Sequence, residues 1–360
     1  MESIKYYKQG KDICLNVYTK LKQVIQENKL SDLSEISKLG NDLLKGALQN
    51  NKGSVFIPIC INLNDCVSFY VDELVNQEIR REYSVVRVGD VVKIEMGVVI
   101  EGFILHFGET FISSGGKERR EWNTETDTNK NANILKKLND IPKRLCKKVY
   151  PELDDSGDIR LVNDDISNFI TSECTKFDCY PATNTISYKG TIDSYENQDE
   201  KIILGFKQKF DETDEWIILD NPCYDIQNGD VFNLNITIVP ERETNYVHNG
   251  KVYKQNEHIY TEPHPPHLYR FTGETHQFNL KSVREFINAV KTKYQRNFFN
   301  KNEISHLISN VKTRLGLQYT VSQGVTNSYP VVYLKRTSDI LPVFFKKCTV
   351  YMWDNKLYLV

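Results

Sequence analysis

The hydrophobic positions near the N-terminus repeat with the period of an α-helix. Four apolar residues share one face of the segment 11–28, namely Ile13, Val17, Leu21 and Ile25. A second segment, from Leu33 to Leu44, repeats this spacing, and Ser31 stands before it as the expected N-cap. The pattern therefore predicts a pair of amphipathic helices at the start of the chain.

Beyond residue 52 the pattern becomes typical of strands, because β-branched and aromatic residues accumulate in short runs. The predicted strands are 55–67, 91–111, 202–206, 215–219, 231–239, 251–260, 267–271, 331–335, 343–353 and 357–360. Helical periodicity returns at 136–148, where Pro142 is expected to interrupt the helix, and at 162–175, 280–299 and 303–315, the last capped by Asn302. This mixture predicts an α+β fold.

One internal similarity suggests that the chain consists of two related halves. The segment Gly89–Glu95 recurs as Gly229–Asn235, and each copy is a Gly-Asp turn followed by a strand-like run. Both copies follow a helical stretch, which favours a duplicated architecture. In such an architecture we expect the functional site where strands of the two halves converge.

Charge is distributed unevenly along the 360 residues. The formal net charge is −2, but residues 281–360 carry thirteen Lys/Arg and four Asp/Glu. A basic end on an acidic body favours a polyanionic partner, although a solvated helix surface gives the same count. No apolar run approaches the roughly 18 residues of a membrane span. The first residues are too polar for a signal peptide, so we expect neither secretion nor a membrane role.

Several motifs resemble the methionine aminopeptidase superfamily, which has the pita-bread fold. The segments that carry this likeness are 7–13, 53–69, 89–98, 101–104, 177–181 and 268–270. The chain is most similar to the proliferation-associated, or ErbB-binding, proteins, a branch without peptidase activity. The resemblance implies an N-terminal helical segment (1–52), a first part of the pita-bread domain (53–270), a basic helical insert (271–329) and C-terminal strands (330–360).

Active members of that superfamily bind two divalent metal ions through Asp, Asp, His, Glu and Glu, and a further His assists catalysis. The resemblance places these six positions, in that order, at Glu95, His106, Tyr188, Asn235, Lys347 and Phe69. Two cations need compensating carboxylates, and this set supplies one carboxylate and one ammonium. We therefore expect no metal, no cofactor and no aminopeptidase activity, with Lys347 paired to Glu95 in a structural ion pair.

Two alternatives remain open from the sequence. Glu95, His106 and Glu109 lie close along a predicted hairpin and could bind one metal ion in a rebuilt metallopeptidase site. A pseudoenzyme could also use the cleft to hold a peptide or protein without cutting it. A core polar role for the three side chains is the better interpretation.

The basic insert carries the positive functional signal. Its candidate RNA-binding residues are Lys281, Arg284, Lys291, Lys293, Arg296, Lys301, Lys312 and Arg314. Tyr294, Phe298 and Phe299 lie between them and could stack on bases, but we favour a packing role for these aromatics. The resemblance implies binding of the large ribosomal subunit near the polypeptide exit tunnel, through rRNA and ribosomal proteins. The eight scattered cysteines, with no Cys-x-x-Cys pair, indicate reduced thiols and favour a cytoplasmic protein that is also present in the nucleus or nucleolus, and we expect a monomer.

Overall fold

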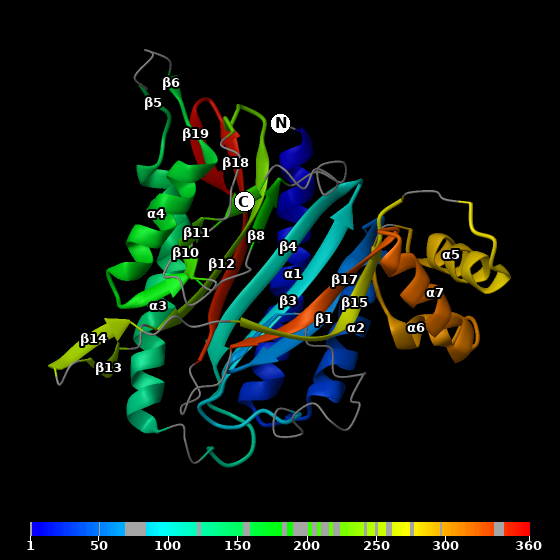
Figure 1. Cartoon of the computed structure of the whole chain (residues 1–360), viewed down its shortest axis with the longest axis horizontal. Coiled ribbons are helices and arrows are strands. Elements are labelled where there is room, and N and C mark those ends of the chain that lie inside the picture. The colour runs from blue at the N-terminus through cyan, green and yellow to red at the C-terminus, as the bar shows by residue number, and fades with distance from the viewer. Residues whose placement is uncertain are drawn as a thin grey trace.

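The computed structural model describes most of the chain, and every structural statement below refers to these residues. They are residues 2–49, 51–68, 84–120, 124–153, 159–181, 186–189, 201–203, 207–209, 216–218, 224–240, 243–248, 251–256, 261–273, 277–295, 297–334 and 342–360. Figure 1 shows one central sheet with helices packed around it.

The central sheet has nine antiparallel strands in the described part of the chain. They are β1 (Gly53–Leu63), β3 (Val91–Ile100), β4 (Phe103–Ile112), β7 (Cys179–Pro181), β8 (Ile186–Lys189), β9 (Lys201–Ile203), β12 (Val231–Pro240), β18 (Phe344–Trp353) and β19 (Lys356–Leu359). The order β1-β3-β4-β18-β12-β8-β9 forms the path, with β19 on β18 and β7 on β12. Strands from the two ends of the chain therefore meet at β4 and β18.

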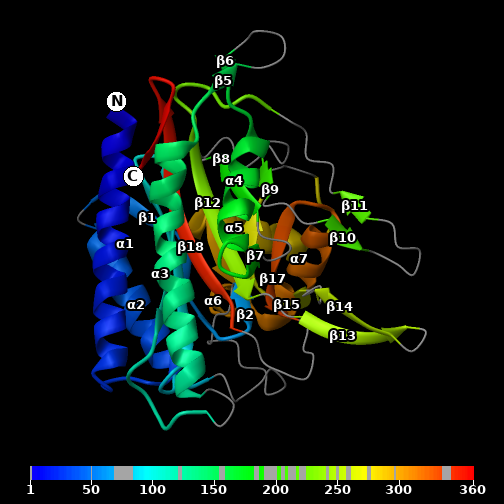
Figure 2. The ribbon, with the colours of Figure 1, turned by 90° about the vertical axis from the view of Figure 1, so that its left-hand side faces the viewer.

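Helices cover one face of this sheet (Figure 2). They are α1 (Glu2–Gln26), α2 (Leu33–Gln49), α3 (Glu125–Lys148) and α4 (Asn163–Thr175). Leu21 of α1 and Ile36 of α2 join Ile94 of β3 in one buried cluster. Leu145 of α3 and Leu234 of β12 belong to a second cluster. Each half of the sheet thus has its own helical cover, as the amphipathic spacing requires.

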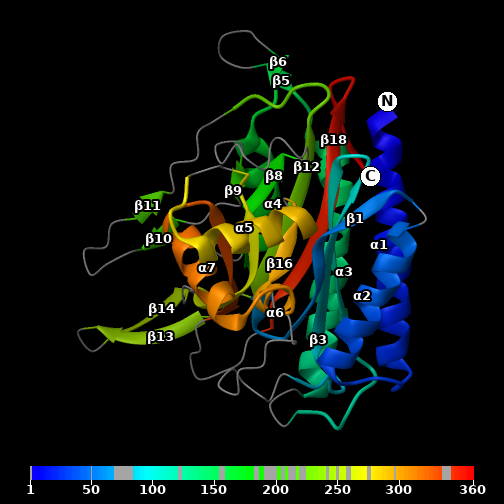
Figure 3. The same cartoon turned by 90° about the vertical axis from the view of Figure 1, so that its right-hand side faces the viewer.

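A smaller sheet and the insert lie on the opposite side of the central sheet from α1 and α2 (Figure 3). Its strands, in the order β16-β15-β17-β2, are β16 (Phe298–Asn300), β15 (Thr261–Phe271), β17 (Thr326–Leu334) and β2 (Cys66–Ser68). The insert helices between β15 and β17 are α5 (Lys281–Lys293), α6 (Lys301–Ser305) and α7 (Asn310–Ser322). Short two-stranded pairs complete the fold: β5 (Glu152–Leu153) with β6 (Ile159–Arg160), β10 (Lys207–Lys209) with β11 (Trp216–Ile218), and β13 (Glu243–His248) with β14 (Lys251–Asn256).

The two Gly-Asp turns found in the sequence have the same hydrogen-bonded structure. Gly89 and Gly229 both have a positive φ, of 86° and 100°, which glycine adopts without strain. The Asp carboxylate accepts a 2.9 Å hydrogen bond from the backbone N–H three residues earlier, in Asp90 as in Asp230. The duplicated architecture is therefore confirmed at these turns, and β3 with β4 corresponds to β12 with β18.

Several local predictions from the sequence are wrong. The helix predicted over 280–299 ends at Lys293, and Phe298–Asn300 form the strand β16. Asp32, not Ser31, caps α2, since its carboxylate accepts from the backbone N–H groups of Ser34 and Glu35 at 2.9 and 3.3 Å. Pro142 does not interrupt α3, which runs through it. The segment predicted as one helix over 303–315 is divided into α6 and α7, and Ser309 rather than Asn302 caps α7.

Candidate functional site

A row of residues crosses five strands on the face of the central sheet that lies away from α1 and α2. The backbone register aligns Cys60 of β1, Glu95 of β3, Gly108 of β4, Lys347 of β18 and Asn235 of β12. Directly opposed residues of neighbouring strands project to the same face. The register thus brings Glu95, Asn235 and Lys347 together, although up to 252 positions separate them in the sequence.

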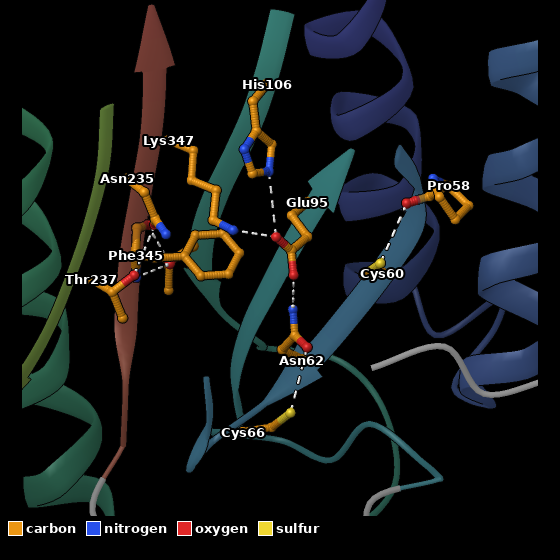
Figure 4. A network of polar contacts seen from close by, with 11 residues as sticks. Pro58, Cys60, Asn62, Cys66, Glu95, His106, Asn235, Thr237, Phe345 and Lys347 are labelled. Atoms are coloured by element: carbon orange, nitrogen blue, oxygen red, sulfur yellow. Dashed lines mark hydrogen bonds and ion pairs between the residues drawn. The ribbon is translucent and has the colours of Figure 1, made fainter. Parts of the chain in front are cut away.

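Lys347 and Glu95 form a buried ion pair (Figure 4). The Lys347 ammonium donates to Oε2 of Glu95, and both side chains are almost fully inaccessible to solvent. To reach Glu95, the Lys347 side chain passes over β4 at Gly108, which has no side chain in its way. This is the structural ion pair expected from the sequence, and it links the two halves at the seam, the contact between β4 and β18.

Gly108 is required for this arrangement. A Cβ atom at this position would lie 2.8 Å from Cγ and 2.9 Å from Cδ of Lys347, and 2.9 Å from Cε2 of Phe345. These distances are shorter than normal carbon–carbon contacts. Gly108 and Lys347 occupy equivalent positions in the two halves and are also paired with each other across the seam. Gly108 was not predicted from the sequence; the available signal was its place in the hairpin that contains the first copy of the repeat.

Further polar contacts fix the Glu95 carboxylate. The Asn62 amide donates to Oε1 of Glu95 at 3.0 Å, and the Cys66 thiol donates to Oδ1 of Asn62 at 3.4 Å. Nε2 of His106 lies 3.5 Å from Oε2 of Glu95. Both oxygens of the carboxylate are thus engaged by protein groups, as a buried charge requires.

The charges at the site shift its protonation equilibria. Burial by itself would raise the pKa of the Glu95 carboxyl, but the ammonium of Lys347 and the neighbouring His106 hold that pKa well below the usual range of a glutamate. Burial and the Lys347 charge lower the pKa of His106 to about 4. At neutral pH Glu95 is therefore a carboxylate and His106 a neutral imidazole.

A second group of buried charges lies beside the first. Burial lowers the pKa of Lys93 to about 8, and its ammonium donates to the backbone oxygen of Asn64 at 2.7 Å. The Arg120 guanidinium contacts Asp90 at 2.8 Å, and the Asn64 amide donates to the same carboxylate at 3.0 Å. The Gly-Asp turn of the first half is therefore fixed by charge-assisted hydrogen bonds.

The other predicted site residues lie around or outside this centre. The Asn235 amide oxygen accepts a 2.9 Å hydrogen bond from Thr237. Tyr188 pairs through its backbone with Asn233 of β12. Phe69 lies outside the described residues. The candidate position Glu109 projects to the opposite face of the sheet and forms an ion pair with Lys346 there, so it does not join Glu95 and His106.

The residues at this centre do not fit a pair of divalent metal ions. Glu95 supplies a carboxylate, but the Lys347 ammonium already neutralises it. No group of three or more His, Cys, Asp and Glu side chains is placed to hold a metal ion within the described ranges. A cation at this position would have to displace an ammonium that is itself buried and paired.

The described basic residues of the insert have different surroundings. Lys281, Arg284, Lys293 and Arg314 are exposed. The Arg284 guanidinium donates to the backbone oxygens of Phe278 and Asn279, which end the segment before α5. All four side chains are exposed, but Lys281 also lies 4.0 Å from a carboxylate oxygen of Glu285, and Lys293 lies 5.1 Å from the centre of the Tyr294 ring. Arg296 lies outside the described residues.

The remaining insert cations lie closer to protein groups. Lys312 forms an ion pair with Glu285. The Lys291 ammonium lies 5.1 Å from the centre of the Phe271 ring, and Lys301 begins α6 and is half-buried. The packing role expected for the aromatics is confirmed, because Tyr294, Phe298 and Phe299 are buried. Phosphate contact would therefore fall to the cations rather than to these rings.

No helix in the described part of the chain combines the length and the hydropathy that a membrane crossing needs.

Comparison with known proteins places the chain among proteins of similar sequence and fold. It is 22% identical over 317 residues to a protein named ErbB-3 binding protein 1 from Arabidopsis thaliana, covering 87% of this chain and 67% of that protein. It is 21% identical to the curved DNA-binding protein of Schizosaccharomyces pombe, covering 99% and 84%. No protein-family model matches the chain.

Among solved structures, a thermophilic Arx1 has a TM-score of 0.68 at 16% identity, with 100% of this chain and 90% of that chain covered. The likeness in fold thus extends over all of the elements described above. The resemblance seen in the motifs is confirmed: the chain has the α+β pita-bread fold and is similar in sequence to the ErbB-3 binding proteins.

Proposed function

We propose that this chain is a catalytically inert, methionine-aminopeptidase-like protein that binds the large ribosomal subunit near the polypeptide exit tunnel. The basic insert makes the contact with rRNA, and the protein acts as a monomer in ribosome biogenesis, subunit export or translational control. It works in the cytoplasm and in the nucleus or nucleolus. The observation that carries the proposal is the Lys347 ammonium, which sits against Glu95 at the centre of the sheet.

The loss of metal chemistry follows from charge. A dinuclear centre activates water because several carboxylates hold two cations close together. Here a protein cation replaces them and neutralises the carboxylate. The same pair argues against a rebuilt mononuclear site, because a metal at His106 and Glu95 would compete with Lys347 for one oxygen, Oε2 of Glu95. A structural role for the pair requires no further ligand.

The insert supports a polyanionic partner. Its exposed cations Lys281, Lys293 and Arg314 lie on α5 and α7, and cations of this kind bind phosphates with a strong dependence on salt. One relative is named a curved DNA-binding protein, which is consistent with nucleic-acid contact. The link to the large subunit rests on the family resemblance, so it needs a direct test.

The inert centre is tested by metal analysis and peptidase assay of the purified full chain. We expect less than 0.1 equivalent of any divalent transition metal, no release of methionine from a Met-Ala-Ser peptide, and no change in melting temperature on adding Mn²⁺ or EDTA. A stoichiometric metal that survives dialysis, or methionine release abolished by Glu95→Gln, would contradict the proposal.

Ribosome binding is tested by sedimentation of the tagged protein in cell lysate at low and then high salt. We expect co-migration with large subunits at low salt, loss at high salt, and loss in the variant Lys281→Glu, Lys293→Glu, Arg314→Glu. Lys20→Glu on the exposed side of α1 introduces the same type of change far from the insert and should leave co-migration intact. A protein that stays at the top of the gradient at low salt excludes this function.

A further inference from the structure

Helix α7 is apolar on two opposite faces. Its buried face contains Gly316 and Leu317, which pack on the core of the insert. Gly316 allows the close approach of α5, since a Cβ atom there would lie 2.4 Å from Cγ of Phe286. This face packs α7 on the rest of the insert, whereas the opposite face is largely exposed in the described part of the chain.

The second face carries exposed hydrophobic side chains in one row. Val311, Leu315 and Tyr319 follow one another at intervals of four residues, and their exposed fractions are 63%, 44% and 41%. Residues four apart lie on the same side of a helix, so the three form a continuous ridge. The Phe278 ring contacts Tyr319 edge-on, with centroids 5.9 Å apart, and extends the ridge beyond the helix. Grouped exposed apolar residues of this kind are typical of interaction sites.

Cations flank the ridge on both sides. With 100° between successive residues, Lys312 lies on one side of Val311 and Arg314 on the other. Arg314 is exposed. Lys312 is half-buried and shares Glu285 with Lys281, so these two lysines and one glutamate together leave a net charge of +1 on that side. The surface therefore combines an apolar stripe with positive borders, and it complements an apolar stripe with negative borders. Figure 3 shows α5 and α7 on the opposite side of the central sheet from α1 and α2.

We propose that the outer face of α7 docks a partner protein through an acidic amphipathic helix. The apolar stripe of that helix packs along Val311, Leu315 and Tyr319, and its Asp and Glu side chains meet Lys312 and Arg314. Helix-on-helix recognition uses anchors at this spacing. Val311 and Leu315 gain nothing from phosphates and cannot stack on bases as aromatic rings do. The Tyr319 ring packs edge-on against Phe278, so the ridge as a whole fits a protein rather than RNA. The surface shares Arg314 with the phosphate-binding cations of the insert, but its apolar ridge goes beyond phosphate binding.

Site-directed photo-cross-linking tests the proposal in cells. A benzophenone amino acid is placed at position 315 of the full chain, and the cross-linked peptides are identified by mass spectrometry. We expect one partner protein, joined through a segment with apolar residues at helical spacing and Asp or Glu beside them. In a Val311→Asp background the yield should fall at least fivefold, because a carboxylate then interrupts the ridge.

Leu15→Asp is the matched control, since Leu15 is an exposed apolar residue of α1. This change should leave the yield at position 315 unaltered. The proposal is overturned by cross-links to RNA, to a second copy of the chain, to another segment of the same chain or to a basic protein segment. It is equally overturned when no product forms or when Val311→Asp leaves the yield unchanged. Equal melting temperatures of the Val311→Asp and parent proteins exclude unfolding as the cause of a loss.

Discussion

At the scale of single residues, the centre of the sheet depends on three positions from three strands. Lys347 passes over Gly108 to reach Glu95, so the charge of one half compensates the charge of the other. Such a pair is costly to bury, and its attraction only offsets that cost when both partners are present. Its contribution is therefore best measured by removing one partner and then both.

We expect Glu95→Gln to lower the free energy of unfolding by about 3–5 kcal/mol, because it leaves the Lys347 ammonium buried and uncompensated. The double variant Glu95→Gln, Lys347→Met should recover most of that loss. Urea denaturation of the full chain measures both values. The pair of Glu109 and Lys346 on the other face is more accessible to solvent, and Glu109→Gln should cost less. Additive losses in the double variant would contradict a direct pair.

Gly108→Ala tests the close approach of Lys347. The added methyl group would meet Lys347 and Phe345 at under 3 Å, and overpacking of this type costs about 1–3 kcal/mol. Gly46→Ala is the control, since nothing lies within 4 Å of a Cβ atom there. In the interior of α2 that change should stabilise the protein by up to about 1 kcal/mol. Thermal unfolding distinguishes the two outcomes, and equal effects would disprove the argument.

Stability should decrease as the pH falls from 6.5 to 4. The pKa of His106 is lowered to about 4 in the folded protein, whereas an exposed histidine has a pKa near 6.5. In this window the unfolded chain binds the proton that the folded chain excludes, which corresponds to about 3 kcal/mol over the whole range. From about pH 4.5 downward the lowered pKa of Glu95 adds a further loss, because this carboxylate becomes protonated in the unfolded chain but not in the folded one.

Urea denaturation at several pH values measures this slope. His106→Gln keeps a neutral polar side chain and should flatten the curve between pH 6.5 and 4. An unchanged slope in that variant would show that other groups cause the pH dependence.

At the scale of elements, periodicity in the sequence located most helices and strands, while their ends and breaks depended on individual side chains. Pro142 shows why. A proline removes one hydrogen bond from a helix, but α3 buries Ile134, Leu138 and Leu145 on the core of the second half, and this packing outweighs the loss. Tertiary packing of this kind is not visible in the local sequence. The division between α6 and α7 has a local origin instead. The Ser309 side chain accepts from the backbone N–H of Lys312 and so begins α7 as a separate helix.

The start of α3 offers a test at this scale. Thr124 and Asp127 form a reciprocal capping box, in which each side chain accepts from the other's backbone N–H, at 3.2 and 3.1 Å. We expect Thr124→Ala to cost about 1 kcal/mol of unfolding free energy. Thr19→Ala removes an exposed hydroxyl within α1 and should change stability by less than about 0.5 kcal/mol. A similar loss in both variants would contradict a specific role for the cap.

At the scale of the whole molecule, the pita-bread fold was predicted from the family resemblance, and the two equivalent halves were predicted from the repeated Gly-Asp segment. The contact between Glu95 and Lys347 was expected from the lost metal positions. The sequence could not show that Lys347 passes over Gly108. That contact depends on how β4 and β18 are aligned, and the two strands come from opposite ends of the chain and share one register pair. The sequence also could not show which apolar face of α7 is buried and which is exposed, since the residues of both faces recur at helical spacing.

The exposed cations of the insert predict how strongly salt weakens the proposed RNA contact, with each cation adding to the salt dependence. Each phosphate contact contributes about −0.9 to the slope of log affinity against log salt for a duplex, and about −0.7 for a single strand. We expect Lys293→Gln and Arg314→Gln each to reduce that slope by roughly one contact. Lys20→Gln on α1 should leave it unchanged. Fluorescence anisotropy with a labelled rRNA fragment measures the slopes, and three equal effects would indicate net charge rather than a surface on the insert.

The pairing of Gly108 with Lys347 also limits how alike the two halves can be. These positions are equivalent in the repeat and face each other across the seam. A chain built from two identical halves would place two lysines there, with like charges in contact, or two glycines, with no cation for Glu95. The centre can therefore form only after the two copies have diverged. Glu95 in the first half needs Lys347 from the second half, and Lys347 needs the space at Gly108. A chain with two copies of either half would therefore lack the ion pair that joins the halves.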